Sequence, residues 1–328
     1  MSLRSAVPFA KAFLKAKLFR RRTPLIVSWL VTRRCNYQCG YCDSWRTPGP
    51  ELEAEQVCDL IDEFAREGTR QIIFTGGEPL VKEGIERIIA RCAEQEIRVG
   101  INSNGALVPQ KLADLDGLRT LTLSLDGPET VQDKLRGQGC FRHVMNAIEA
   151  AQSRNLRLRL LTVLSSENLD QVPFVLETAR SVGGRVFFQP ATEQVLRGEH
   201  VNPYTPDRAA YKKVLDDLIA EKRSGQHSTA IAHSLTGLQY LRNWPEDCPI
   251  PCAGGLLFCR VTPTANLKIC GQTDLPPGDN NCALLGVRRA FEAIPLITCD
   301  HCWCASRLEV NQLMMLRVDV ARNLLALE

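Results

Sequence analysis

Short runs of branched and aromatic residues alternate with amphipathic segments through the first half of the chain. The runs, which predict strands, are 25–32, 71–74, 97–101, 120–125, 156–163 and 186–188. Between them, apolar residues recur at every third or fourth position, for example within 52–64, 85–92 and 172–179. This spacing predicts helices that bury one face. Six alternating units of this kind predict an α/β fold, in which a parallel sheet with right-handed crossovers curls into a partial (β/α)6 barrel.

The pattern changes after Gln189. A turn is predicted at 203–206 and a helix at 208–222, and from Asn243 onward Pro, Gly and Cys become frequent. A last amphipathic helix is predicted at 307–327. We therefore expect a basic helical arm at 1–23, the partial barrel at 24–205, a helical linker at 206–242 and a small cysteine-rich domain at 243–328.

The first 34 residues carry nine Lys or Arg and no Asp or Glu. Because the whole chain has 40 basic and 37 acidic residues, the remainder has an acidic excess despite the net charge of +3. Segment 7–22 mixes large apolar residues with basic ones, which is typical of a helix that lies on an anionic membrane. Since Lys17 falls among the apolar positions, packing against the body is an alternative, and a mitochondrial transit peptide is a third.

Hydrophobic residues make up 45% and charged residues 23% of the 328 residues, which is ordinary for a folded chain and argues against disorder. No apolar run reaches the roughly 20 residues that a membrane-spanning helix requires. Fourteen cysteines are unusual, and eight of them lie between Cys248 and Cys304. Without a secretory signal, such clusters indicate metal ligands in a reducing compartment. We expect a cytoplasmic protein, with peripheral membrane contact as an alternative and no nucleic-acid partner.

A cysteine triplet follows the first predicted strand, where the loops of a barrel carry its chemistry. Cys35, Cys39 and Cys42 form a C-x3-C-x2-C pattern. A 4Fe–4S cluster needs one thiolate per iron, so three cysteines leave one iron open to a small molecule. A structural zinc site is the alternative, although zinc normally takes four protein ligands and no fourth follows nearby.

A second motif, T-G-G-E-P, follows the second predicted strand and contains Gly76, Gly77 and Glu78. The paired glycines would let a bare backbone approach a ligand of the open iron closely. Glu78 would offer a carboxylate to a cationic group of that ligand.

The triplet, Tyr41 just before its last cysteine, and the Gly-Gly-Glu run together resemble the radical S-adenosylmethionine (radical SAM) superfamily. The resemblance implies that S-adenosylmethionine chelates the open iron of a 4Fe–4S cluster through its amino and carboxylate groups. One electron then cleaves the sulfonium to give methionine and a 5'-deoxyadenosyl radical, which abstracts a hydrogen atom from a substrate. This chemistry implies an electron donor of the reduced flavodoxin or ferredoxin type.

Segment 124–128, with the sequence S-L-D-G-P, resembles a stretch of SPASM-type radical SAM enzymes. In that family the serine and an arginine twelve residues later hold the methionyl carboxylate, which implies this role for Ser124 and Arg136, with Asp126 beside them. A guanidinium and a hydroxyl suit a carboxylate in a low-dielectric site. Asn104 ends another predicted strand, where it either reaches the ribose of the cosubstrate or belongs to a plain turn.

A second cysteine group lies near the C-terminus. Cys252 and Cys270 flank a predicted hairpin, and Cys299 and Cys302 form a C-x2-C pair. Such thiols can converge on one metal centre. The pattern over 250–305 resembles the twitch domain, a shortened relative of the SPASM extension. The resemblance implies one auxiliary 4Fe–4S cluster held by these four cysteines, and a structural zinc site is the alternative.

Alternative ligands of the auxiliary site are Cys248, Cys259, Cys282 and Cys304. Cys58 and Cys92 lie on apolar helix faces, which favours buried inert thiols, and the role of Cys140 is open. The twitch pattern has a glycine where this chain has Ala265. The turn must therefore avoid a positive φ at that position, or Asn266 must adopt it.

We expect a radical SAM enzyme that oxidises, dehydrogenates or joins bonds in a small molecule or lipid. Twitch relatives include dehydrogenases of sugar-like alcohols, and only one short helix precedes the first predicted strand. A peptide-modifying or protein-modifying maturase is the first alternative. A noncatalytic iron–sulfur electron carrier or redox sensor is the second, although it would leave Glu78 and the glycine pair without a role.

The cyclase branch of molybdenum-cofactor synthesis is set aside, because its members end in a Gly-Arg-rich tail and 323–328 has none. No residue is identified as the acid or base that acts on the substrate. The five histidines show no paired spacing. His301 lies within the auxiliary cysteine pair, where a hydrogen bond from it would tune that cluster.

Overall fold

A sheet of eight strands organises the protein. The computed structural model describes residues 3–42, 44–154, 156–192, 194–195, 200–246, 248–271 and 280–326. Six strands are parallel and follow one another in chain order: β1 (Ile26–Thr32), β2 (Gln71–Gly76), β3 (Arg98–Ser103), β4 (Leu118–Ser124), β5 (Arg157–Leu164) and β6 (Arg185–Pro190). The predicted α/β class and its six parallel strands are confirmed.

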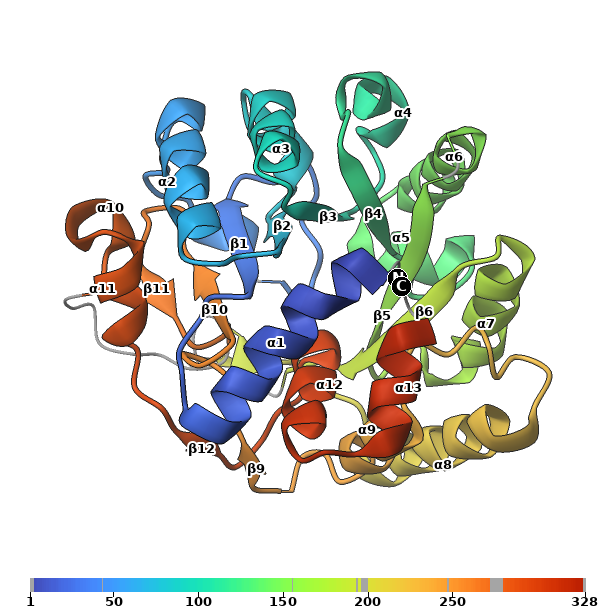
Figure 1. The fold of residues 1–328 in the computed structure, drawn as a ribbon. Helices are drawn as coiled ribbons and strands as arrows, with labels where there is room; N and C mark the ends of the chain where they lie inside the picture. Colours follow the sequence, from blue (N-terminus) through green and yellow to red (C-terminus); the bar gives the residue numbers. More distant parts are fainter. Residues whose placement is uncertain are drawn as a thin grey trace.

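Helices after each strand cover the outer face of this sheet (Figure 1). They are α2 (Ala54–Arg66), α3 (Ile85–Glu94), α4 (Val108–Lys111), α5 (Glu129–Arg136), α6 (Cys140–Ser153) and α7 (Val172–Ser181), with short 3-10 turns at Ser44–Arg46, Pro79–Val81, Leu112–Asp114 and Leu169–Gln171. Their apolar faces are buried against the strands, as at Phe64, Ile88 and Val175. The three-to-four spacing in the sequence therefore marks the buried side of these helices.

The predicted C-terminal hairpin joins the main sheet. Strand β10 (Phe258–Val261) pairs in parallel with β1, and β11 (Leu267–Lys268) returns antiparallel beside it, so the sheet order is β11-β10-β1-β2-β3-β4-β5-β6. The cysteine-rich segment thus extends the edge of the barrel. Two short pairs complete the strands: β9 (Ile250–Pro251) with β12 (Thr298–Cys299), and β7 (Gln194–Val195) with β8 (His200–Val201).

The single helix expected at 307–327 is wrong, because the structure has two. Helix α12 (Ala305–Met314) ends before Leu316, whose φ of 59° is left-handed, and α13 (Val318–Ala326) begins beyond it. The break lets α13 turn back onto α9 (Leu235–Leu241), where Asp319 accepts hydrogen bonds from the backbone N and hydroxyl of Thr236. The remaining helices are α8 (Arg208–Ser224), α10 (Cys282–Leu285) and α11 (Val287–Glu292).

The N-terminal arm forms helix α1 (Leu3–Phe19), which runs across the sheet beside α12 (Figure 1). Its inner face, with Phe9, Phe13 and Ala16, packs on an apolar cluster formed by Leu25, Ala253, Leu256, Leu257, Phe258 and Met314. Lys17, which interrupts the apolar pattern, donates to the carbonyl oxygen of Met314 at 2.7 Å. The arm therefore packs against the body. Among the described residues, no helix has the length and apolar character to cross a membrane.

Candidate active site

The first cysteine loop leaves the carboxyl end of β1 and lies against the end of β2. The backbone N–H of Gly77 donates to the carbonyl of Thr32 at 3.0 Å, and that of Glu78 donates to the carbonyl of Arg34 at 2.9 Å. Both acceptor residues lie within three positions before Cys35 in the sequence. The structure therefore brings the cysteine triplet and the Gly-Gly-Glu motif together at one edge of the sheet.

The two glycines are required by this backbone packing. A Cβ atom on Gly76 would lie 2.3 Å from the carbonyl oxygen of Thr32, and one on Gly77 would lie 2.1 Å from that of Arg34. No side chain fits at such distances, because the obstructing atoms are backbone. The close approach that demands glycine is thus made to the cysteine loop of the chain itself.

Glu78 is fully buried and connects the ends of β2 and β3. Its carboxylate accepts from the backbone N of Leu80 at 3.1 Å, the hydroxyl of Ser103 at 3.0 Å and the backbone N of Asn104 at 2.7 Å. Burial raises the pKa of Glu78 to about 7, although the three donors oppose this. The carboxylate therefore fixes the position of Asn104.

Asn104 in turn contacts the cysteine loop. Its side-chain nitrogen donates to Oδ1 of Asn36 at 2.7 Å and lies 3.9 Å from Sγ of Cys35. The sulfur of Cys35 also accepts from the backbone N of Tyr37 at 3.4 Å. Sequence reasoning missed Asn36, and its position between two cysteines is the only signal that the sequence offers for it.

Asp126 is the centre of a buried polar network. Its Oδ2 atom accepts from the hydroxyl of Tyr41 at 2.5 Å and from Nε of Arg136 at 2.7 Å, and its Oδ1 atom accepts from the backbone N of Val163 at 2.9 Å. Burial would lower the pKa of Arg136, but Asp126 and Tyr41 raise it well above its usual value. With three donors on its carboxylate, Asp126 positions Tyr41 and Arg136.

Helix α5 brings Arg136 from the end of β4 back to the cysteine loop. The carbonyl of Arg136 lies 3.8 Å from Sγ of Cys39, and its guanidinium carbon lies 5.4 Å from the centre of the Tyr41 ring. Ser124 is half-buried at the end of β4. Gln132, which sequence reasoning missed, bridges the carbonyl of Ser124 and the backbone N of Asp126. The twelve-residue spacing thus places Ser124 and Arg136 at one end of the barrel.

Two aromatic residues that sequence reasoning missed cover the cysteine loop. A Cβ atom on Gly40 would lie 2.4 Å from the hydroxyl oxygen of Tyr204, whose ring packs edge-on against Tyr41 at 6.1 Å between ring centres. Nε1 of Trp45 donates to the carbonyl of Cys39 at 3.2 Å. Tyr204 comes from the segment beyond β6, so only the fold reveals its contact with this loop.

Three thiols in this loop fit the ligand set of a cluster with one open iron. Burial raises the pKa of Cys39 to about 12 and also raises the pKa of Cys35. The free thiols of Cys35 and Cys39 are therefore protonated at neutral pH and would release protons when iron binds. The N–H donors near Cys35 suit a sulfur that carries negative charge.

The second cysteine group borders a small hollow. Cys252, Cys270, Cys299 and Cys302 all line one hollow of about 20 Å³, together with Cys304. The sulfur of Cys252 accepts from the backbone N of Gly254 at 3.3 Å, and that of Cys302 accepts from Nδ2 of Asn311 at 3.3 Å. Burial raises the pKa of Cys252 to about 11. Several thiols around one hollow, with hydrogen bonds to sulfur, fit an iron–sulfur cluster.

Two further cysteines of the C-terminal segment lie outside the hollow. Cys259 is fully buried in β10 opposite Val27 of β1, and the thiol of Cys282 donates to the carbonyl of Ala265 at 3.1 Å. Cys304 lines the hollow, and Cys248 lies beside it, because its backbone N donates to the carbonyl of Asp300, between Cys299 and Cys302. Cys92 and Cys140 are fully buried and Cys58 is half-buried.

The turn between β10 and β11 contains Ala265, at the position where the twitch pattern has a glycine. Ala265 itself adopts a φ of 65°, and the expectation that this position would avoid a positive φ, or pass it to Asn266, is wrong. Three hydrogen bonds outweigh the cost: the N–H of Ala265 donates to Thr262, and its carbonyl accepts from the backbone N and the thiol of Cys282.

Comparison with known proteins agrees with this geometry. The model of the radical SAM superfamily matches residues 29–179. The chain is 30% identical to "Probable GTP 3',8-cyclase" of Methanosarcina mazei over 266 residues, which cover 76% of this chain and 78% of that protein. The chain belongs to the radical SAM superfamily. The assignment based on the cysteine triplet and the Gly-Gly-Glu run is confirmed.

Other relatives extend over most of the chain. "AdoMet-dependent heme synthase" of Methanosarcina barkeri is 25% identical over 281 residues, covering 78% of this chain and 79% of that protein. The crystal structure of Streptococcus suis SuiB bound to S-adenosylmethionine matches with a TM-score of 0.65 at 17% identity, covering 88% of this chain and 70% of SuiB. The predicted fold is confirmed. Membership of the superfamily implies an enzyme that uses a 4Fe–4S cluster and S-adenosylmethionine.

Proposed function

We propose that this radical SAM enzyme abstracts a hydrogen atom from an anionic small molecule or lipid, in an oxidation, dehydrogenation or bond-forming step. Cys35, Cys39 and Cys42 hold the cluster that binds S-adenosylmethionine. Arg136 and Ser124 bind its carboxylate, and Arg136 is suited to this because Asp126 occupies its Nε and fixes its orientation. Tyr41, Glu78, Asn104 and the glycine pair shape the same end of the barrel.

The observation that supports an anionic substrate is a half-buried guanidinium that pairs with no carboxylate among the described residues. Arg260 lies in β10, and no described residue forms an ion pair with it or with Arg307. Burial, followed by the charge of Arg307, lowers the pKa of Arg260 to about 10. The thiols of Cys304 and Cys270 oppose this lowering, and Arg33, beside the first cysteine loop, adds to it more weakly. Enclosed cations this close together are stabilised by an anion such as a carboxylate or phosphate.

The names of the relatives support the same substrate class. Heme carries carboxylate groups and GTP carries phosphates, so the heme synthase and cyclase relatives are both named for anionic molecules. Cyclisation of GTP is a second candidate, because the 30% identity to the M. mazei protein extends over three quarters of this chain. This similarity outweighs the difference between 323–328 and the Gly-Arg-rich segment of the cyclase branch.

We assign an auxiliary 4Fe–4S cluster to Cys252, Cys270, Cys299 and Cys302. Their convergence on one hollow supports this assignment, and Cys304 or Cys248 is the alternative ligand. A cluster whose irons all have protein ligands serves electron transfer, substrate anchoring or structure. Reduction of both clusters calls for a donor of the flavodoxin or ferredoxin type, and the reduced thiols are consistent with the cytoplasm.

The test is deuterium transfer into 5'-deoxyadenosine. Cluster-loaded protein, reduced with dithionite, is incubated with S-adenosylmethionine and deuterated candidates: GTP, a carboxylated porphyrin, an anionic lipid and a neutral sugar alcohol. We expect deuterium from an anionic candidate. Transfer only from the neutral alcohol would overturn the proposed substrate class, and absence of S-adenosylmethionine cleavage would favour the noncatalytic alternative.

A variant tests the role of Arg260 separately. Arg260→Ala should raise the KM of the accepted substrate and leave S-adenosylmethionine cleavage without substrate unchanged. Arg119→Ala is the matched control, because this exposed arginine of β4 has the same charge and does not adjoin either cysteine group. An unchanged KM in Arg260→Ala would remove this residue from the substrate site.

A further inference from the structure

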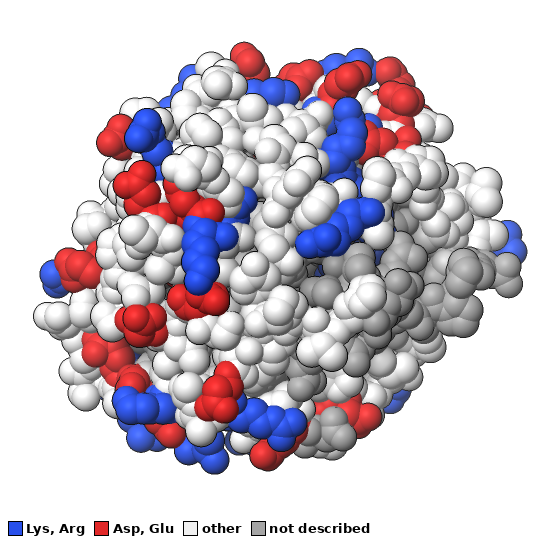
Figure 2. Space-filling view, turned by 180° about the vertical axis from the view of Figure 1, so that it is seen from behind, with Lys and Arg blue, Asp and Glu red and all other residues white. Residues whose placement is uncertain are grey.

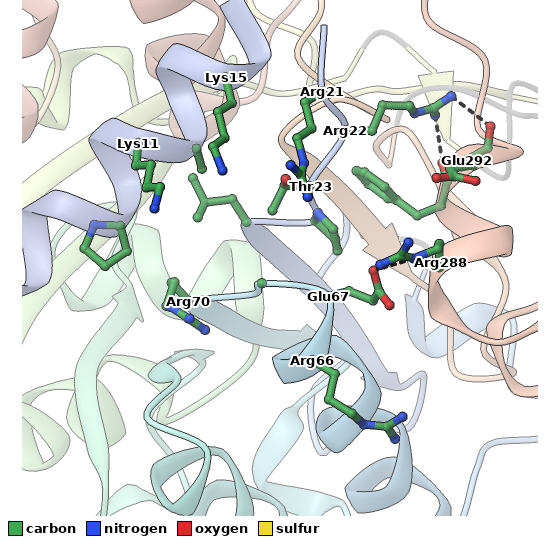
Figure 3. Close-up of a pocket in the computed structure, with 16 residues that line it drawn as sticks. Lys11, Lys15, Arg21, Arg22, Thr23, Arg66, Glu67, Arg70, Arg288 and Glu292 are labelled. Carbon is green, nitrogen blue, oxygen red and sulfur yellow. Dashed lines mark hydrogen bonds and ion pairs between the residues drawn. The ribbon is translucent and has the colours of Figure 1, made fainter. Parts of the chain in front are cut away.

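A basic hollow lies at the end of the barrel opposite the first cysteine loop. It has a volume of about 440 Å³ and is lined by helix α1, the segment before β1, the segment between α2 and β2, and helix α11 (Figure 3). These segments precede their strands, whereas the cysteine loop follows β1. The hollow is therefore separate from the site of radical chemistry, and it is large enough for a small ligand.

The lining is strongly cationic. Seven Lys or Arg residues line the hollow but only two Glu, which is a greater excess than the net charge of +3 of the whole chain. The cations are Lys11, Lys15, Arg21, Arg22, Arg66, Arg70 and Arg288. On the face of the molecule turned away from the viewer in Figure 1, basic and acidic side chains are interspersed around a largely uncharged centre (Figure 2). The hollow thus holds a local concentration of one sign.

Two of these arginines are occupied by the fold itself. Arg22 donates to the backbone carbonyls of Gly255 at 2.7 Å, Phe291 at 2.7 Å and Glu292 at 2.8 Å, which ties the chain before β1 to α11. Arg288 forms an ion pair with Glu67 at 3.0 Å. Arg22 and Arg288 thus form part of the wall of the hollow. The ion pair of Arg288 neutralises Glu67, which is one of the two carboxylates in the lining.

Of the other five cations, Arg70 donates to the backbone carbonyl of Thr69 at 2.9 Å. No described residue forms an ion pair with Lys11, Lys15 or Arg21, and the same holds for Arg66 and Arg70. Lys11 and Lys15 lie one turn apart on α1 and extend from it toward the side of the hollow on which Arg70 lies (Figure 3). Like charges in a concave site repel one another, and a bound anion removes this cost.

We propose that this hollow binds a phosphate-bearing anion. Lysine ammonium groups act as compact point charges toward phosphate, and arginines add directed pairs of N–H donors. The ligand can come from two sources, a phospholipid headgroup or a soluble phosphate compound.

The outer face of α1 favours the lipid. Val7, Leu14 and Leu18 share one face by their spacing and are 56%, 54% and 68% exposed. Because Lys11 lies between Val7 and Leu14 in the same helix, this apolar row adjoins the lysines at the mouth of the hollow. An apolar row beside basic side chains is the arrangement with which helices lie on anionic membranes.

Full-length, cluster-loaded protein is titrated with pyrophosphate by calorimetry, and is sedimented with vesicles of phosphatidylcholine that either contain or lack phosphatidic acid. The key variant is Lys11→Ala/Lys15→Ala. Each cation near an anionic surface contributes about 1 kcal/mol, so this variant should bind the acidic vesicles on the order of 30-fold more weakly. The matched control is Lys212→Ala/Lys213→Ala on α8, which removes the same charge from an exposed helix away from the hollow.

The two sources are separated by Leu14→Ser/Leu18→Ser. Loss of vesicle binding with retained pyrophosphate binding identifies the lipid headgroup. Pyrophosphate binding without vesicle binding in the wild type identifies a soluble phosphate compound. The proposal is overturned if the wild type binds neither probe, or if the α8 control loses as much as the α1 variant. Cleavage of S-adenosylmethionine should be unchanged in the α1 variant, so failure here and failure of the proposed reaction are distinguishable.

Discussion

The two cysteine groups of this protein are built in opposite ways. Cys35, Cys39 and Cys42 come from a single loop after β1, and buried polar residues at the ends of β2, β3 and β4 support that loop. The second group collects its thiols from before β10, after β11 and around β12, and its hollow is also lined by Phe258, Ile269 and Ile297.

The first group is formed by residues close together in the sequence, whereas the second group depends on tertiary contacts. In the first group the spacing of the cysteines keeps the three thiols within one loop, and the hydrogen bonds of Glu78 and Asp126 support that loop. In the second group the pairing of β9 with β12 brings the segment of Cys252 beside Cys299, and the β10–β11 hairpin brings Cys270 to the same hollow. We expect mutations in the first group to affect chemistry most, and mutations in the second to affect the assembled edge of the sheet.

The largest effect is expected from replacing Cys35, Cys39 and Cys42 with Ala. The variant should lose S-adenosylmethionine cleavage completely and about half of its iron, since the cluster with the open iron has no remaining protein ligands. Chromatography of 5'-deoxyadenosine and iron analysis measure both. Cys58→Ala, at a half-buried thiol on α2, should change neither. Retained cleavage in the triple variant would contradict the assignment of these ligands.

Cys299→Ala/Cys302→Ala should also lose about half of the iron. It should still cleave S-adenosylmethionine slowly, because the first loop does not depend on these thiols, but it should not complete oxidation of the substrate. Cys259→Ala/Cys282→Ala, at thiols outside the hollow, should keep the full iron content. If Cys299→Ala/Cys302→Ala keeps its iron as well, Cys304 or Cys248 is a ligand in place of one of the pair. Zinc in the wild-type protein would refute the auxiliary cluster.

Asp126→Ala should destabilise the fold by about 3 to 5 kcal/mol, because it leaves the charge of Arg136 buried without its partner. Urea unfolding followed by circular dichroism measures this change. Asp216→Ala breaks the exposed pair with Arg242 and should cost less than about 1 kcal/mol. Equal costs for the two variants would show that the buried network does not support the first loop.

Arg136→Ala should weaken S-adenosylmethionine binding by about 1.5 to 3 kcal/mol.

The buried carboxyl of Glu78 should make stability depend on pH. Its pKa is raised to about 7 in the folded protein, so the folded state binds more protons than the unfolded state between about pH 4.5 and 7. The contribution of Glu78 is full at the acidic end of this window and falls by about 3 kcal/mol as pH rises through it. We expect the difference in unfolding free energy between the wild type and Glu78→Gln to fall accordingly. A constant difference would mean that Glu78 has an ordinary pKa.

The smallest effect concerns the turn of the second group. Ala265→Gly relieves a left-handed φ that costs an alanine about 1 to 2 kcal/mol, but it also removes a buried methyl group worth about 0.8 kcal/mol. The unfolding free energy should therefore rise by less than about 1 kcal/mol. Leu316→Gly, at an exposed left-handed residue between α12 and α13, is the comparison without a buried methyl. Destabilisation by Ala265→Gly alone would show that the methyl contact dominates.

Much of the fold could be predicted because it repeats locally. The apolar spacing within 52–64 and 85–92 matches the buried faces of α2 and α3, and the predicted strands differ from the observed ones only at their ends. The prediction of a single helix at 307–327 is wrong for a local reason as well. Its apolar spacing runs on past Leu316, and nothing in that spacing shows that the chain turns there to reach α9.

The sequence by itself determined the order of strands and helices, the cysteine triplet and the Gly-Gly-Glu motif, because each depends on residues a few positions apart. Only the tertiary structure decided that β10 lies beside β1, and that Asp126 joins Tyr41 to Arg136. It also decided that α1 forms one wall of a basic hollow. These contacts join residues up to more than two hundred positions apart, so their formation depends on how the whole sheet closes, and no local spacing records that.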